Sequence, residues 1–189
     1  MSQGFATFRV FPPTFPLSIS QGGTGQTTTT GSDVLPLSTG GTLSQPNITG
    51  VINASVASAG NVGEEITASR AIGSASAMTT GTLINVTSMS LTAGDWDVRG
   101  VVGFAVGGST VLATISGGSS VTSLTLTTER YSNISFPAAA NPVGPSYILT
   151  IPYQRISLAT TTTVYLVAVA SFSVAGCSGY GSMSARRVR

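Results

Sequence analysis

The sequence predicts an all-β fold built from short antiparallel strands, arranged as a sandwich or a barrel. From about residue 52 onward, apolar and polar residues alternate in short runs. Clusters of Gly, Asn and Pro separate these runs, and no run has a convincing helical period. Regularly spaced short strands with turn signals between them are typical of antiparallel sandwiches and barrels.

The first 50 residues are expected to form an extended N-terminal arm rather than part of the core. Five prolines and two pairs of glycines interrupt this stretch, so we expect it to be ordered only against a partner. Four phenylalanines lie near its start: Phe5, Phe8, Phe11 and Phe15. Their spacing is close to helical, but Pro12 and Pro13 lie within it, which favours aromatic anchors on an extended segment. The alternative is that these rings cap the base of the following domain.

About eight strands are expected after the arm. They are Ile84–Leu91, Trp96–Val106, Val111–Ser116, Leu124–Thr127, Tyr147–Ile151, Ile156–Leu158, Val164–Phe172 and Tyr180–Val188. The clearest of them places alternate apolar residues, beginning at Trp96, on one face and Asp95, Asp97 and Arg99 on the other.

One strand is apolar on both faces. In Val164–Phe172, Leu166 and Ala168 share one face, while Tyr165 and Val167 share the other. Such a strand is expected at the centre of a sheet that is covered on each side. In a sandwich of two layers, the second cover would come from a neighbouring subunit, so the pattern favours an oligomer.

The composition argues against several function classes. Only 7% of the residues are charged, His is absent and all eight basic residues are arginines, so acid–base catalysis is disfavoured. The arginines are scattered or terminal and form no basic face for nucleic acid. No run reaches the ~20 apolar residues of a membrane helix, and the aromatic residues are too few for an outer-membrane barrel. Cys177, the single cysteine, fits a reducing cytosol and is expected to be a small buried or loop residue.

Asp95 and Asp97, with Trp96 between them, are the local candidates for a sugar-cleaving site. The favoured interpretation is simpler: Ala93, Gly94 and Asp95 form a turn into a strand, and the acids are solvated or paired with Arg99. Glu64 and Glu65 have no neighbouring metal-ligating residue in the sequence, although a calcium site assembled from distant loops stays open. We therefore expect no enzymatic activity, no cofactor and no bound metal.

Several segments resemble small bacteriophage virion structural proteins. Leu17–Thr28, LSISQGGTGQTT, lacks the Lys of a phosphate-binding loop but resembles the GGTG junction of tail-fibre and related proteins, with Gly22, Gly23 and Gly25 in its turn. LTAGDWDVRGVV, ISLATTTTVYLVAVASFS and the terminal SARRVR resemble the C-terminal jelly-roll region of such proteins. The resemblance implies a homotrimer in which an N-terminal attachment arm, residues 1–50, precedes a TNF-like or knob-like β-jelly-roll, residues 51–189.

The function implied by this resemblance is mechanical and adhesive. The chain is expected in the virion, after synthesis in the host cytoplasm, as a short tail-fibre or spike-like appendage with an outward knob. Its expected partners are other virion proteins of the tail or capsid, with a host cell-surface glycan as a further one. The alternative is a capsid decoration or head-fibre protein, which the short length and the absence of coiled-coil heptads favour. A sugar-cleaving depolymerase is the rival of a different class.

Overall fold

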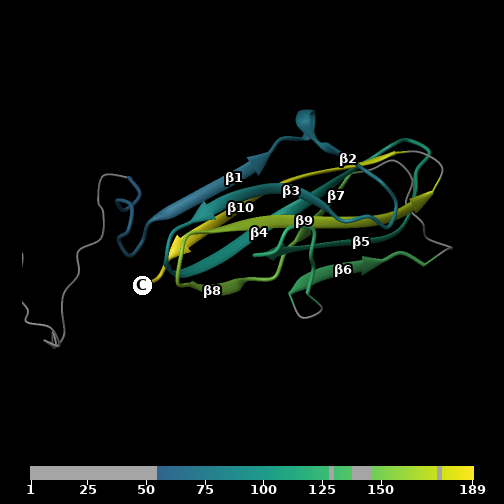
Figure 1. Ribbon diagram of the computed structural model, residues 1–189. Helices are drawn as coiled ribbons and strands as arrows, with labels where there is room; N and C mark the ends of the chain where they lie inside the picture. Colours follow the sequence, from purple (N-terminus) through teal and green to yellow (C-terminus); the bar gives the residue numbers. More distant parts are fainter. Residues whose placement is uncertain (1–54, 128–129, 138–145, 174–175) are drawn as a thin grey trace, which may run out of the picture. The chain divides into compact units, whose positions relative to one another are not determined.

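The computed structural model describes residues 55–127, 130–137, 146–173 and 176–189 (Figure 1). The predicted arm, with Phe5, Phe8, Phe11, Phe15, Gly22, Gly23 and Gly25, lies outside these residues. The described chain forms ten strands and one short 3₁₀ helix, η2 (Ile72–Ser74), which agrees with the predicted all-β class. The described residues contain no helix of the length and apolar character that a bilayer span requires.

The strands form two antiparallel sheets. The first, here called the β10 sheet, has β10 (Cys177–Arg187) and β4 (Gly94–Val106) at its centre. β1 (Glu65–Arg70) and β2 (Ser76–Met78) pair with β10 on one side, while β8 (Gln154–Leu158) and β7 (Tyr147–Thr150) pair with β4 on the other.

The second sheet, here called the β9 sheet, has the order β3–β9–β5–β6. Its strands are β3 (Ile84–Leu91), β9 (Thr162–Ser173), β5 (Val111–Ser120) and β6 (Tyr131–Ser135). Side chains join the two sheets at both edges. Arg70 Nε donates to the Val86 carbonyl at 2.5 Å, and Ser132 Oγ donates to the Thr150 carbonyl at 2.7 Å. The described chain is therefore a β-sandwich with bridged edges.

A single apolar core fills the space between the sheets. From β4, Trp96, Val98, Val102 and Phe104 are completely buried, so the predicted alternation in this strand is confirmed. The β9 sheet contributes inward-facing side chains from β3, β9 and β5, among them Leu91, Leu112, Ile115, Val164, Leu166 and Ala168. Burying each large apolar side chain stabilises the fold by roughly 1.5–3 kcal/mol, which makes this core the main source of stability.

β9 lies between β3 and β5, as expected for a strand that is apolar on both faces. On its outer face Val167 is fully buried, and its register neighbours Asn85 on β3 and Gly118 on β5 both lie against residues 121–127. Asn85 Nδ2 donates to Ser123 Oγ at 2.8 Å, and the Leu124 amide donates to Asn85 Oδ1 at 3.0 Å. Gly118 leaves the space that Leu126 occupies, since an added Cβ would lie 3.0 Å from Leu126 Cδ2. The outer face of β9, for which the sequence pattern favoured a cover from a neighbouring subunit, is thus covered in part by residues 121–127 of the same chain.

This arrangement corrects one predicted strand. Leu124–Thr127 is not a strand, because Leu124 has φ = 52° and a side chain rather than a neighbouring strand accepts its amide. The strand beside β5 is Tyr131–Ser135 instead. Besides β6, two further strands were not predicted, β1 and β2. Their short sequences contain few β-branched or aromatic residues, and their backbone hydrogen bonds are made with β10.

We predict that Asn85→Ala will release residues 121–127 while leaving the two sheets intact. The variant loses both hydrogen bonds to that segment, which should cost about 1 kcal/mol of folding free energy because the bonds are partly solvent-exposed. Hydrogen exchange at the Leu124 amide should accelerate. Asn133→Ala is the matched control, since it also removes an amide bond to a serine, at Ser116 Oγ, but contacts no part of the segment. Equal exchange at Leu124 in both variants would contradict this account.

Candidate functional site

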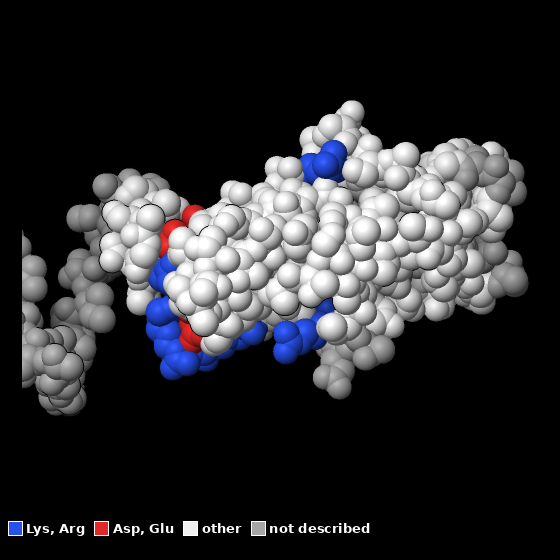
Figure 2. Space-filling view, in the orientation of Figure 1, with Lys and Arg blue, Asp and Glu red and all other residues white. Residues whose placement is uncertain are grey.

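Most charged residues of the described chain gather at one end of the sandwich, while Arg70, which donates to the Ser74 carbonyl of η2, and Arg130 lie apart from it (Figure 2). This charged end comprises Glu64, Glu65, Asp95, Asp97, Arg99, Arg155, Arg186, Arg187 and Arg189. The described chain enters the domain here, where the Gly63 amide donates to the Arg187 carbonyl at 2.9 Å, and it also ends here at Arg189. In Figure 2, no blue or red atoms are visible at the opposite end of the sandwich.

A buried ion pair closes the core at this end. Arg187 Nε lies 2.9 Å from Glu64 Oε2, and both side chains are less than a tenth exposed. The Gly60 amide donates to the same carboxylate oxygen at 2.8 Å. This backbone hydrogen bond, together with the Arg187 guanidinium, holds the pKa of Glu64 below its usual range although burial opposes the shift.

Arg187 also covers the only tryptophan of the chain. Its Cζ lies 4.3 Å from the centre of the Trp96 ring, in a cation–π arrangement. Nη1 donates to the Ala93 carbonyl at 2.7 Å, and Nη2 donates to Thr92 Oγ1. Gly94 makes this possible: it has φ = 137°, and a Cβ at this position would overlap the Arg187 guanidinium. The guanidinium therefore joins β10 to the turn between β3 and β4.

Asp95 lies beneath two other arginines and is only 5% exposed. Its register partner on β8 is Ser157, whose hydroxyl donates to Oδ1. Arg155 Nη2 donates to Oδ2 at 2.8 Å, and Arg189 Nε reaches the same oxygen. The Ser157 hydroxyl and then the two guanidiniums hold the pKa of Asp95 well below its usual range. The expectation that this acid is solvated or paired with Arg99 is therefore wrong.

The outer face of the β10 sheet carries a row of alternating charges across four strands. In register order the row is Glu65 on β1, Arg186 on β10, Asp97 on β4 and Arg155 on β8. Arg99, in the next row of β4, lies 3.7 Å from Glu65 and donates to Ser184 Oγ at 3.1 Å. Opposite charges on neighbouring strands attract one another, so this row stabilises the pairing at the charged end.

The arrangement at Asp95 and Asp97 suits a structural role better than sugar cleavage. A glycosidase acid must hold its proton near neutral pH, which requires a raised pKa. Asp95 instead is kept ionised by the Ser157 hydroxyl and two arginines. Within the described residues, no group of three His, Cys, Asp or Glu side chains could hold a metal ion. The geometry therefore places Asp95 in ion pairs with Arg155 and Arg189, and Asp97 between Arg186 and Arg155 in the strand register.

Two of the hollows on the described surface lie near the charged residues discussed above. One, of about 390 Å³, runs over the outer face of the β10 sheet and is lined by Thr67, Ser69, Arg99, Thr150, Ser182 and Ser184, among others. The other, of about 490 Å³, lies at the charged end beside Asp95, Ser157 and Arg189. Neither hollow brings together the groups of a nucleophilic or acid–base site.

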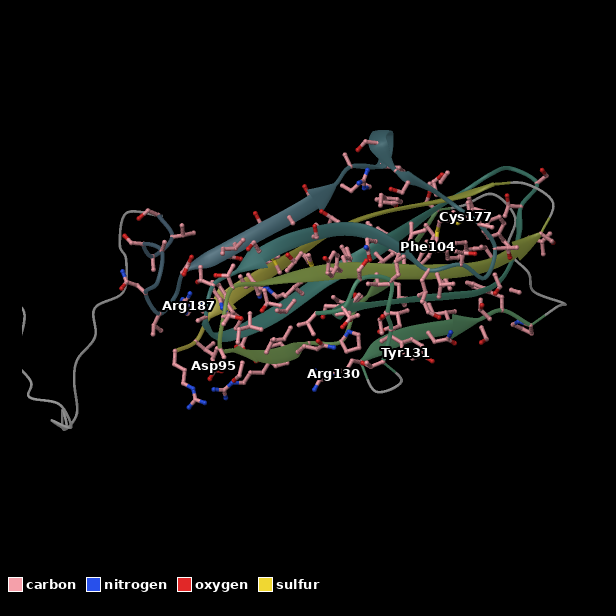
Figure 3. The ribbon with its side chains drawn as sticks, in the orientation of Figure 1. Asp95, Phe104, Arg130, Tyr131, Cys177 and Arg187 are labelled. Atoms are coloured by element: carbon pink, nitrogen blue, oxygen red, sulfur yellow. The ribbon has the colours of Figure 1, made fainter. Side chains whose placement is uncertain are left out.

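Cys177 lies near the opposite end from Asp95 and Arg187 (Figure 3). It is 2% exposed, and its sulfur lies 4.0 Å from Met78 Sδ. Burial raises the pKa of this thiol to about 11, so it stays protonated and unreactive at neutral pH. The expectation of a small buried residue is confirmed.

Comparison with protein families, with curated proteins and with solved structures finds no match to this chain. The predicted anchor residues of the arm lie outside the described part of the chain. The charged end was missed by sequence reasoning, apart from the pair Asp95 and Asp97. Its one sequence signal is the run of arginines in SARRVR, which alternation places on both faces of a terminal strand.

We predict that Arg187→Gln will destabilise the domain by about 3 kcal/mol, because it leaves the Glu64 carboxylate buried without its partner. Urea unfolding followed by Trp96 fluorescence measures the change. Arg186→Gln is the matched control: it removes an exposed arginine from the adjacent position and should shift stability by no more than about 0.5 kcal/mol. Equal effects of the two substitutions would contradict the role given to Arg187.

Stability should fall in acid and stay level between about pH 5 and 8. Because the pKa values of Glu64 and Asp95 are lowered in the folded state, their contribution is complete above the unfolded values. It is lost as pH falls from about 4 toward the folded values. No His titrates in between. The urea midpoint measured against pH tests this, and Asp95→Asn should reduce the acid slope; an unchanged slope would count against the ion pairs at Asp95.

Proposed function

We propose that this chain is a bacteriophage virion structural protein that works as a short tail-fibre or spike-like appendage. Residues 1–50 attach it to the particle, and residues 51–189 form an outward adhesive knob that assembles as a homotrimer. The GGTG junction and the C-terminal segments that resemble virion proteins are the sequence basis for this proposal.

The strand order supports a jelly-roll for the knob. β1 and β2 both pair with β10, and β7 and β8 both pair with β4, so each of these two pairs can be counted as one row. Each sheet then has four rows. When the rows are numbered one to eight along the chain, neighbouring rows of the β10 sheet follow the order 1–8–3–6. Those of the β9 sheet follow the order 2–7–4–5. This is the order expected of an eight-row jelly-roll, an architecture common in viral capsid domains.

The observation that carries the proposal is the difference in charge between the two ends of the domain. The first described residues lie at the charged end, where the Gly63 amide donates to the Arg187 carbonyl and the Gly60 amide donates to the Glu64 carboxylate. The opposite end, which carries no charge among the residues coloured in Figure 2, is then free to face outward. An attachment segment on one side and an exposed surface on the other is the geometry that an appendage needs.

A capsid decoration protein is the second candidate, favoured by one feature of the sequence. No heptad repeat is present that could form a shaft between arm and knob. A knob held close to its attachment point suits a head coat as well as a short spike. Neither function uses catalysis, and Asp95 is engaged in ion pairs with Arg155 and Arg189.

We predict that a chain lacking residues 1–50 will remain a folded β-sheet trimer but will no longer bind particles. Each phenylalanine ring of the arm is worth roughly 1.5–3 kcal/mol when buried, and three arms add through multivalency. Purified protein would be added to particles made without it, and binding measured by co-sedimentation, with mass measured by light scattering.

The partner follows from the particle type in the same experiment. Binding to tail-less heads would support the decoration protein, and binding only to particles with tails would support the appendage. If the truncated chain still binds particles, or if the full chain is a monomer at micromolar concentration, the proposed division between arm and knob is wrong.

A further inference from the structure

We propose that the charged end is a second contact with the particle, and that it binds a protein surface that carries acidic side chains. This inference rests on the proposed function, because it takes the particle as the partner. It adds a named surface of the knob to the attachment that the arm provides.

At the charged end, three of the arginine side chains are more exposed to solvent than the acidic side chains. The side chains of Arg99, Arg155 and Arg189 are 70%, 52% and 76% exposed. Those of Glu64, Asp95 and Glu65 are 9%, 6% and 34% exposed. A partner that approaches this end therefore meets guanidinium groups first, as the predominance of blue over red in Figure 2 illustrates.

The described hydrogen bonds use only some of the N–H donors of these guanidiniums. A guanidinium has five N–H groups, and Asp95 takes one nitrogen each from Arg155 and Arg189. Among the described contacts, Arg99 directs Nε to Ser184 and lies at the long distance of 3.7 Å from Glu65. The remaining donors have the planar geometry that matches carboxylates.

The alternating row favours a protein partner over nucleic acid. Asp97 lies between Arg186 and Arg155 in register, and Glu65 lies beside Arg186 at the β1 end of the row, so a continuous phosphate backbone would meet two carboxylates as it crossed the row. A protein surface can place its acids opposite the arginines and avoid the carboxylates. Complementary charge of this kind sets orientation and association rate more than affinity.

Weak contacts at the charged end are sufficient to orient the knob if the arm already holds it on the particle. Residues 60–64, among the first that the structure describes, lie at this end, and the proposed attachment through the preceding residues would hold the arginines close to the particle. Under that condition the second contact is effectively intramolecular and gains from a high effective concentration. Exposed ion pairs of modest strength can then fix the angle of the knob on the particle.

The test uses the full chain and particles made without it. Arg99→Gln, Arg186→Gln and the double variant remove exposed charges while sparing Arg155, Arg187 and Arg189, which hold buried acids. Arg130→Gln is the matched control, because Arg130 is exposed and lies apart from Asp95 and Arg187 (Figure 3). Association rates would be measured by surface plasmon resonance at increasing NaCl, with thermal unfolding as a check on folding.

We expect the double variant to associate about tenfold more slowly than the parent chain at low salt, and Arg130→Gln to match the parent. The difference should disappear near about 0.5 M NaCl, where charges are screened. Equal rates for the parent and the double variant would overturn the inference while leaving attachment by the arm intact. Competition by duplex DNA that is lost in the double variant would assign the surface to nucleic acid and overturn it as well. A parent chain that binds no particle at any salt would refute the proposed function itself.

Discussion

The Arg187 guanidinium is the interaction on which the end of the sandwich depends. It contacts the Glu64 carboxylate, the Trp96 ring and the turn that joins β3 to β4. Together with Arg187 itself, these groups come from three parts of the chain, so one side chain joins the first described residues, the two central strands of the β10 sheet and the turn that connects the sheets. A guanidinium is suited to this position because its flat face can stack on an indole while its edge donates to several acceptors.

The rest of the structure follows from how few charges the sequence contains. The described acids are all used within the charged end, where each lies against an arginine or in the alternating row. Elsewhere the surface is formed mainly by Ser, Thr and Gly, and the sheets rely on a shared apolar core and on side-chain hydrogen bonds at both edges. Because charge is concentrated at one end, the domain has a direction, and the proposed attachment and the second contact with the particle both use it.

The strands that were predicted correctly are those with a local signal. Trp96–Val106 alternates over a long stretch, and Val164–Phe172 is apolar on both faces, so their positions at the centre of the sheets could be inferred from sequence. Leu124–Thr127 has the same alternation over a shorter length, but the Asn85 side chain captures the Leu124 amide. β1 and β2 had no such signal, because their register is imposed by β10. Short segments are decided by partners far away in the chain.

The sequence by itself determined the all-β class, the inward face of β4 and the central position of β9. Each of these depends on residue type and on a period of two along one strand. Only the tertiary structure decided what the charges do. Asp95 obtains its partners from residues 60 and 94 positions away, and Glu64 obtains Arg187 from 123 positions away. No local pattern encodes such pairs, because they form only when the sheet register has brought the two ends of the described chain together.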